Sequence, residues 1–197
     1  MILKRLFDLF FSLIGMIFLI PIFIIIALLI KIDSKGSIFY KQVRVGKNLH
    51  PFKIYKFRTM KDDSDKKGLL SLGKNDSRIT KIGHALRKYK LDELPQLINV
   101  LKGEMSFVGP RPEVKKYVDL YSEKQKEVLE VKPGITDKAS LEYFEEEQLL
   151  GVSKNPEKTY IEVIMPRKIE INKKYLSKRT LLTDIALIFK TFFRMIK

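Results

Sequence analysis

The chain has 197 residues, a length that suggests one domain with room for an appendage. Its 38 lysines and arginines outnumber 23 aspartates and glutamates, and the net charge of +15 indicates an anionic partner such as nucleic acid, an anionic membrane or a phosphate-bearing substrate. With no cysteine and only two histidines, His50 and His84, the chain has no disulfide framework, thiolate nucleophile or histidine-rich metal cluster.

An uncharged apolar segment, LFFSLIGMIFLIPIFIIIALLI, lies between Asp8 and Lys31. It is long enough to cross a bilayer as a helix, and so small a domain could hardly bury a helix that is apolar on every side. The segment is too long for the core of a signal peptide, and no small-x-small cleavage site follows it. We therefore predict a membrane-inserted helix within residues 1–36 and a second domain over residues 37–197.

Pro21 lies near the middle of this segment, where its missing backbone donor is expected to kink the helix. Lys4 and Arg5 flank one end, and Lys31 and Lys35 flank the other. Because basic residues favour the cytoplasmic side, matching charges at both ends give no single orientation. On the residues alone, the helix either bends at Pro21 and returns to the same side, or spans the membrane with a bend.

The next segments predict a hairpin, a loop and a helix. In residues 37–59, two runs rich in Val, Ile, Phe and Tyr flank Gly46-Lys47-Asn48, as in a β-hairpin. Residues 61–77 are polar and predict a loop. Residues 79–102 have helical periodicity, which Pro95 is expected to break.

Helix start signals follow in the second half of the chain. Ser122 with Gln125 resembles a capping box that opens a helix toward Val131. Asn155-Pro156 predicts another helix start. Residues 180–197 predict an amphipathic helix with Asp184 and several basic residues on its polar face. Such a helix could lie in a membrane interface or dock on the protein's own core.

Two adjacent acids, Asp92 and Glu93, open the stretch LDELPQLINVLKGEMSFVGPRPEV. Neighbouring side chains on a helix point about 100° apart, so the two carboxylates suit different roles. One could attack an electrophile while the other holds a divalent metal. The helix dipole alone also favours acids at a helix N-terminus, so the pair by itself is compatible with a structural role.

Basic residues surround this acidic pair. Arg111 lies between two prolines downstream, and its guanidinium fork suits phosphate oxygens. A carboxylate nucleophile, a metal ligand and arginines in one segment suit phosphoryl transfer. A structural salt bridge for Arg111, and a solvated or lipid-contacting basic face, remain alternatives. The upstream basic residues are Arg78, Lys81, Arg87, Lys88 and Lys90.

A series of motifs occurs in a fixed order over residues 1–137. From the N-terminus they are KRLFD (4–8), FKIYKFRTM (52–60), RITKIG (78–83), LDELPQ (91–96), NVLKG (99–103), MS (105–106), VGPRP (108–112) and KPGIT (132–136). In these motifs the chain resembles the monotopic phosphoglycosyl transferases of the bacterial sugar transferase family.

The resemblance implies a fold and a location. The expected fold class is α+β, a monotopic membrane protein with a re-entrant N-terminal helix and a short β-hairpin. A small, mainly helical catalytic domain with interfacial amphipathic helices is expected on the cytoplasmic face of the bacterial inner membrane. Inner-leaflet anionic lipids are expected partners, and nucleic acid is not.

The resemblance also implies a reaction. Members transfer a phospho-sugar from a UDP-sugar to polyprenyl (undecaprenyl) phosphate with Mg²⁺, through a covalent aspartyl intermediate, and release UMP. This is the first membrane step of a bacterial glycan pathway. By motif match, Asp92 is the expected nucleophile, and Asp92 and Glu93 are the expected metal ligands. Arg111, Arg87 and Arg78 are expected to bind substrate phosphate, and Pro21 is expected to break the membrane helix.

The chain departs from the family pattern at two places. Ile20 precedes Pro21, where members often have serine. After KPGIT many members read Gly-Trp-Ala-Gln-Val-Asn-Gly-Arg, whereas residues 137–147 here read DKASLEYFEEE and resemble another branch. This second departure leaves the sugar open. The competing readings are a membrane-anchored basic protein that binds nucleic acid or anionic lipid, a homologue without activity, and a transferase without a covalent intermediate.

Overall fold

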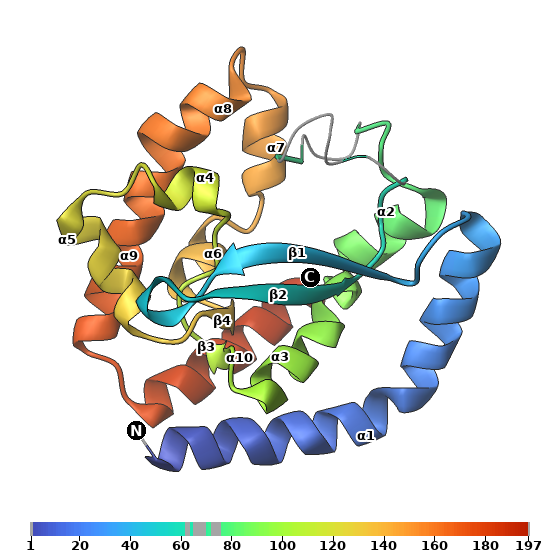
Figure 1. Cartoon of the computed structure of the whole chain (residues 1–197), viewed down its shortest axis with the longest axis horizontal. Helices are drawn as coiled ribbons and strands as arrows, with labels where there is room; N and C mark the ends of the chain where they lie inside the picture. Colours follow the sequence, from blue (N-terminus) through green and yellow to red (C-terminus); the bar gives the residue numbers. More distant parts are fainter. Residues whose placement is uncertain (1, 62–63, 65–69, 72–75, 197) are drawn as a thin grey trace.

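The computed structural model describes residues 2–61, 64, 70–71 and 76–196, and it is a mixture of helix and strand that is 63% helical. The first helix, α1 (Ile2–Asp33), contains Pro21 and is long and apolar enough to cross a membrane. Figure 1 shows α1 as a bent rod whose concave side holds the rest of the chain. A proline inside a helix removes one backbone hydrogen bond and crowds the preceding turn, which accounts for a bend.

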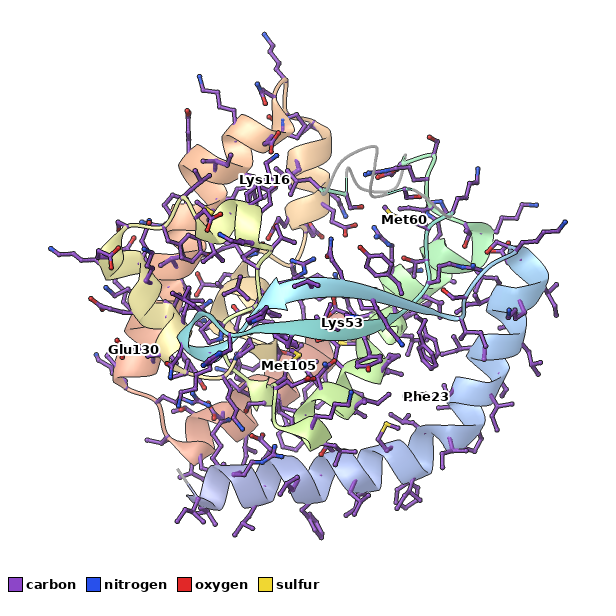
Figure 2. The ribbon with its side chains drawn as sticks, viewed as in Figure 1. Phe23, Lys53, Met60, Met105, Lys116 and Glu130 are labelled. Carbon is purple, nitrogen blue, oxygen red and sulfur yellow. The ribbon has the colours of Figure 1, made fainter. Side chains whose placement is uncertain are left out.

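The convex side of α1 is apolar and uncovered. Figure 2 shows side chains projecting from this side, away from the other elements. Phe18 is 77% exposed and Leu28 is 59% exposed, whereas Ile26 and Ile30 on the concave side are buried. A row of exposed apolar side chains of this length marks a membrane or interaction surface. The finding confirms the expectation that α1 is not a helix buried in a soluble core.

Three polar residues of the KRLFD motif fasten the start of α1 to the rest of the chain. The Lys4 ammonium pairs with buried Asp184 at 2.5 Å. Arg5 donates hydrogen bonds to the carbonyl oxygens of Val100 and Leu101 at 2.6 and 2.9 Å. These carbonyls end a helix, where cations are favoured.

Asp8 makes the third of these attachments, because its buried Oδ1 accepts hydrogen bonds from Ser106 Oγ at 3.1 Å and from the Phe107 backbone N–H at 3.2 Å. Helix α1 and the segment that contains β3 are thus packed together. The expected division between residues 1–36 and 37–197 as separate domains stays a prediction.

The predicted hairpin is confirmed. Strands β1 (Phe39–Val45) and β2 (Pro51–Phe57) pair antiparallel, and Val43 stands opposite Lys53. The short 3₁₀ turn η1 (Lys47–Leu49) connects them. Alternate residues of β2 point inward, so Phe52 and Ile54 are buried against Val100 and Met105.

The predicted break at Pro95 was wrong. Helix α2 (Lys81–Lys88) ends first, and Lys90 then adopts a left-handed conformation with φ of 53°. Pro95 lies inside the next element, the 3₁₀ helix η4 (Leu91–Gln96), which continues into α3 (Leu97–Lys102). The fixed φ of proline is close to the helical value, so the chain continues as a helix through Pro95 despite the missing N–H.

Two short strands, β3 (Ser106–Val108) and β4 (Gly134–Thr136), pair in parallel, and the sequence patterns did not predict them. Between them lie α4 (Lys115–Val118), α5 (Glu123–Lys126) and η5 (Glu127–Glu130). The capping box expected from Ser122 and Gln125 is present at the start of α5. The predicted loop over 61–77 lies mostly outside the described residues.

The C-terminal third is helical. The Asn155 side chain caps α8 as predicted, accepting a hydrogen bond from the Lys158 N–H at 3.1 Å. The predicted terminal helix is present, but Asp184 from its expected polar face is buried, because it pairs with Lys4 and Arg179. The elements are α6 (Lys138–Glu142), α7 (Glu146–Gly151), α8 (Pro156–Thr159), the π-helical η6 (Tyr160–Ile164), α9 (Met165–Ser177) and α10 (Leu181–Ile196).

Candidate functional site

Asp92 lies on η4 and is buried, with 6% of its surface exposed. Its Oδ1 atom has no hydrogen-bond partner in the described part of the chain. Burial raises the pKa of Asp92, and the charges of nearby Lys56 and Arg87 partly offset that effect. An ionised carboxylate has lone pairs on both oxygens, so this buried oxygen has acceptor capacity that the described residues do not use.

Glu93, the next residue, is fully engaged. Its Oε1 lies 2.6 Å from Arg111 Nη2 and 2.7 Å from Lys56 Nζ, and its Oε2 lies 3.2 Å from Arg111 Nη1. Burial alone would raise the pKa of Glu93, but the charges of Arg111 and Lys56 hold it well below its usual range. Two adjacent acids in environments that push their pKa values apart are suited to two different roles.

A close contact between the backbones around Gly109 and Gly134 fixes the position of Arg111. Gly109 and Gly134 face each other at the end of the β3–β4 pair, and a Cβ built on Gly134 would meet the Gly109 nitrogen at 2.1 Å. The Gly109 N–H donates to the Thr136 carbonyl at 3.1 Å, and the Gly134 N–H donates to the Pro110 carbonyl at 3.1 Å. This pairing fixes the chain immediately before Arg111, and Pro112 restricts it immediately after.

The other two predicted arginines are placed differently. Arg87 lies close enough for its charge to lower the pKa of Asp92, and its guanidinium donates to Thr59 Oγ1 at 3.0 Å and Ser71 Oγ at 2.5 Å. Arg78 instead pairs with Asp76 at 2.6 Å and donates to backbone carbonyls. The structure therefore brings Arg87 and Arg111 to the acidic pair. The phosphate-binding roles of all three arginines stay predictions.

A cavity of about 440 Å³ extends from Glu93 and Arg111 to the membrane helix. Its polar end also includes Lys90, Glu146 and Lys168. Apolar side chains of α1, α3 and α10 form its opposite wall. They include Phe11, Leu19, Leu97, Ile188, Phe192 and Met195.

Residues of the segment 143–147, which departs from the family pattern, line the polar end of this cavity. Glu146 pairs with Lys168 at 2.5 Å, and Glu147 lies 3.4 Å from Arg87. The Phe144 ring makes cation–π contacts with two cations. Its centroid lies 5.6 Å from Lys90 Nζ and 5.4 Å from Arg194 Cζ. Acids and an aromatic ring of this segment thus contact four cations, two of which, Lys90 and Lys168, line the cavity.

The metal expected here would depend on few protein ligands. Within the described residues there is no group of three or more His, Cys, Asp or Glu side chains that could hold a metal ion. Mg²⁺ sites that also bind substrate phosphates use one or two carboxylates and complete their coordination with phosphate and water oxygens. The unpaired Oδ1 of Asp92 fits such a ligand. Glu93 fits less simply, because Arg111 and Lys56 already hold its oxygens.

Several residues of the site received no role from the sequence. Lys56 follows Phe52 and Ile54 at the same spacing along β2, so the strand alternation places it on the inward face. A lysine at an inward strand position was therefore a usable signal. Lys168 and the apolar wall come from α9, α10 and α1, and no local pattern relates them to Asp92.

A model of the bacterial sugar transferase family matches residues 1–197. The chain belongs to the bacterial sugar transferase family. The match confirms the family expected from the ordered motifs, and it extends beyond them to the C-terminal third. This family member is 50% identical over 141 residues to "Uncharacterized sugar transferase EpsL" of Bacillus subtilis (strain 168), covering 72% of this chain and 69% of that protein.

Two further relatives carry names that state an activity. This family member is 35% identical over 191 residues to the UDP-N-acetylgalactosamine-undecaprenyl-phosphate N-acetylgalactosaminephosphotransferase of Aeromonas hydrophila, covering 95% of this chain and 42% of that protein. It is 34% identical over 200 residues to the UDP-glucose:undecaprenyl-phosphate glucose-1-phosphate transferase of Escherichia coli (strain K12), covering 98% of this chain and 40% of that protein. The chain spans less than half the length of these two relatives.

Arg111→Lys is expected to lower kcat/KM for sugar transfer by roughly tenfold or more, although it keeps the charge. A lysine ammonium is a point charge and cannot make the planar, two-pronged contact of a guanidinium. Arg167→Lys is the matched control, because Arg167 is an exposed arginine on α9 that pairs with Glu170. Equal kcat/KM for both variants and the wild type would show that the geometry of the Arg111 fork is irrelevant.

Proposed function

We propose that this chain transfers a sugar phosphate from a UDP-sugar to undecaprenyl phosphate or a similar polyprenyl phosphate, and that UMP is the second product. Two relatives named as transferases to undecaprenyl phosphate support the substrate class. The cavity supports it independently, because its charged end suits phosphates and its apolar wall suits a lipid tail. The sugar and the glycan pathway are not part of the proposal.

The unpaired, buried Oδ1 of Asp92 carries the proposal. Buried carboxylate oxygens in folded proteins nearly always have a partner, so an orphaned one beside several cations has a use that the folded chain alone does not reveal. Glu93 is tied to Arg111 and Lys56 and cannot easily supply a second free oxygen. Asp92 is therefore the better nucleophile of the two.

The reaction follows from this assignment in two displacements at one phosphorus atom. Asp92 Oδ1 attacks the sugar-bearing phosphorus of the UDP-sugar, and the bond from that phosphorus to the bridging oxygen breaks, so UMP leaves with the bonding electron pair. A phosphate oxygen of the polyprenyl phosphate then attacks the same phosphorus and expels Asp92 as a carboxylate. Arg111, Lys56 and Arg87 would stabilise the negative charge that builds up on the phosphoryl oxygens in both steps.

Mg²⁺ belongs to the same proposal. Asp92 would hold it together with substrate phosphate oxygens, and Glu93 would approach it from the neighbouring position on η4. When bound, the ion would neutralise charge on the diphosphate and favour departure of UMP.

The central test is UMP release by the full chain in detergent, with undecaprenyl phosphate, Mg²⁺ and a panel of UDP-sugars. We expect turnover with at least one UDP-sugar, and a fall of about a thousandfold or more in Asp92→Asn, which removes the anionic nucleophile at nearly constant volume. A radiolabelled sugar phosphate should remain on the wild-type protein after denaturation and be absent from Asp92→Asn. Turnover near wild type in Asp92→Asn would remove Asp92 from the nucleophile role.

Glu93→Gln should reduce turnover and shift the Mg²⁺ dependence to higher concentrations. A neutral amide is a poorer ligand for a hard cation than a carboxylate. The variant also frees Arg111 and Lys56 from their shared partner, so reduced turnover alone does not separate the two roles. The midpoint of the Mg²⁺ titration separates the role of metal ligand from the role of ion-pair partner. An unchanged midpoint would assign Glu93 solely to holding Arg111 and Lys56.

The membrane arrangement is part of the proposal as well. α1 would enter the inner leaflet of the bacterial inner membrane and return to the cytoplasmic side. The bend of α1 supports this (Figure 1), as do the basic residues at its two ends, Lys4-Arg5 and Lys31-Lys35. The start of α1 also contacts the residues that follow its end in the chain, through Lys4, Arg5 and Asp8. A spanning helix would place these contacts across the bilayer.

Replacing Pro21 with Leu should straighten α1 and favour spanning. The chain has no native cysteine, so the variants Ile2→Cys and Ser37→Cys can each be probed in intact cells with a membrane-impermeant maleimide. We expect both positions to be protected with Pro21 present, and position 2 to react after Pro21→Leu. Reaction at position 2 with Pro21 present would contradict re-entry, and labelling in lysed cells controls for reactivity.

A further inference from the structure

Lys168 is a buried cation in the cavity that the proposed reaction does not use. It lies on α9, with 8% of its surface exposed, and lines the cavity together with Glu93 and Arg111. Its Nζ donates to Glu146 Oε2 at 2.5 Å, and Glu146 is its one hydrogen-bond partner among the described residues. A lysine ammonium has three N–H donors, so a single carboxylate oxygen leaves donor capacity for a ligand.

Glu146 pairs with one cation of the cavity and acts electrostatically on a second. It pairs directly with Lys168, and its charge is close enough to Arg111 to help raise the pKa of that guanidinium above its usual range. It also belongs to the segment 143–147 that covers the polar end of the cavity. A phosphate that contacted Lys168 would therefore compete with this carboxylate for the ammonium.

We propose that Lys168 is a further phosphate-binding residue of this cavity, and that Glu146 holds its ammonium until a substrate phosphate replaces the carboxylate. The inference rests on the proposed function, since it requires a phosphate substrate in the cavity. A phosphate carries more charge and more acceptor oxygens than one carboxylate, so it can satisfy donors of Lys168 and Arg111 together. The phosphate could be the diphosphate of the nucleotide sugar or the head group of the polyprenyl phosphate.

A solely structural role would look different in variants. If the Lys168–Glu146 pair only fastens α7 to α9, then removing either partner leaves the other buried without its partner, and both changes damage the protein in the same way. If Lys168 binds phosphate, the two changes have opposite effects. Loss of Lys168 weakens phosphate binding, whereas loss of the Glu146 charge removes a competitor for the same ammonium.

The experiment compares Lys168→Met, Glu146→Gln and Lys174→Met in the full chain in detergent. Lys174 lies on the same helix and pairs with Glu170 at 2.8 Å, but its side chain is 75% exposed and it does not line the cavity, so it is the matched control. KM is measured separately for the UDP-sugar that gives the highest turnover and for undecaprenyl phosphate. We expect Lys168→Met to raise one of these KM values by roughly tenfold or more, as for loss of a charged hydrogen bond.

Glu146→Gln should leave that same KM unchanged or lower it, and Lys174→Met should match the wild type. The KM that moves identifies which of the two phosphates Lys168 contacts. Equal rises in Lys168→Met and Glu146→Gln, or no change of either KM in Lys168→Met, would overturn the inference.

A binding measurement separates this inference from the proposed function and covers variants with low activity. The rise in Tm of the wild type with added UDP, and separately with undecaprenyl phosphate, requires no turnover. We expect Lys168→Met to lose most of the rise with one of the two, and Lys174→Met to keep both. A wild type that is stabilised but transfers no sugar phosphate would contradict the proposed function and leave the role of Lys168 to be decided by the variants. Equal stabilisation of Lys168→Met and wild type by both compounds would overturn the inference.

Discussion

The buried ion cluster of Lys56, Glu93 and Arg111 joins three segments that are far apart in the sequence, namely strand β2, the 3₁₀ helix η4 and the chain that follows β3. Burying a charge costs several kcal/mol unless it is paired with good geometry, so Lys56 and Arg111 each depend on Glu93, and Glu93 depends on both. The cluster explains why two adjacent acids are needed, because Asp92 and Glu93 have different environments. Glu93 is committed to the two cations, and this leaves Asp92 beside them with an unpaired oxygen. Asp92 keeps an unpaired oxygen because Glu93, its neighbour, makes the ion pairs with Lys56 and Arg111.

The membrane helix is part of the site as well as an anchor. Asp8 accepts a hydrogen bond from the backbone of Phe107 on β3, and β3 leads directly to the Gly109-Pro110 turn that places Arg111. Phe11 and Leu19 of the same helix line the cavity that ends at Arg111. A displacement of α1 would therefore change both the apolar wall and the support of Arg111, the arginine that we propose binds phosphate. An enzyme acting on an amphiphile needs its charged centre at a fixed depth relative to the lipid, and these contacts can supply that depth.

Local patterns predicted what depends on local physics. The hairpin follows from strand-forming runs around a turn, and the starts of α5 and α8 follow from side chains that cap their own helix. The break within residues 79–102 was misplaced, because a left-handed Lys90 ends α2 before Pro95 is reached, and lysine gives no local signal for that conformation. The β3–β4 pair and Lys168 depend on contacts between distant segments, which single-sequence patterns do not encode. The Asp-Glu pair and Arg111 were found through motif order, whereas the unpaired state of Asp92 required coordinates.

We propose the covalent route rather than direct transfer between two bound substrates, and the arrangement of charge supports this proposal. Direct transfer would hold a nucleotide diphosphate and a lipid phosphate in the cavity at once, and their like charges would face each other in surroundings that screen charge poorly. The cations around the acidic pair are already partly occupied. Glu93 holds Lys56 and Arg111, and Thr59, Ser71 and Glu147 contact Arg87. They suit one phosphoryl group at a time. In the covalent route, the nucleotide departs before the lipid phosphate arrives, so the same cations serve both displacements in turn. One unpaired carboxylate oxygen on the residue next to Glu93, which lines the charged end of the cavity, fits such a sequence.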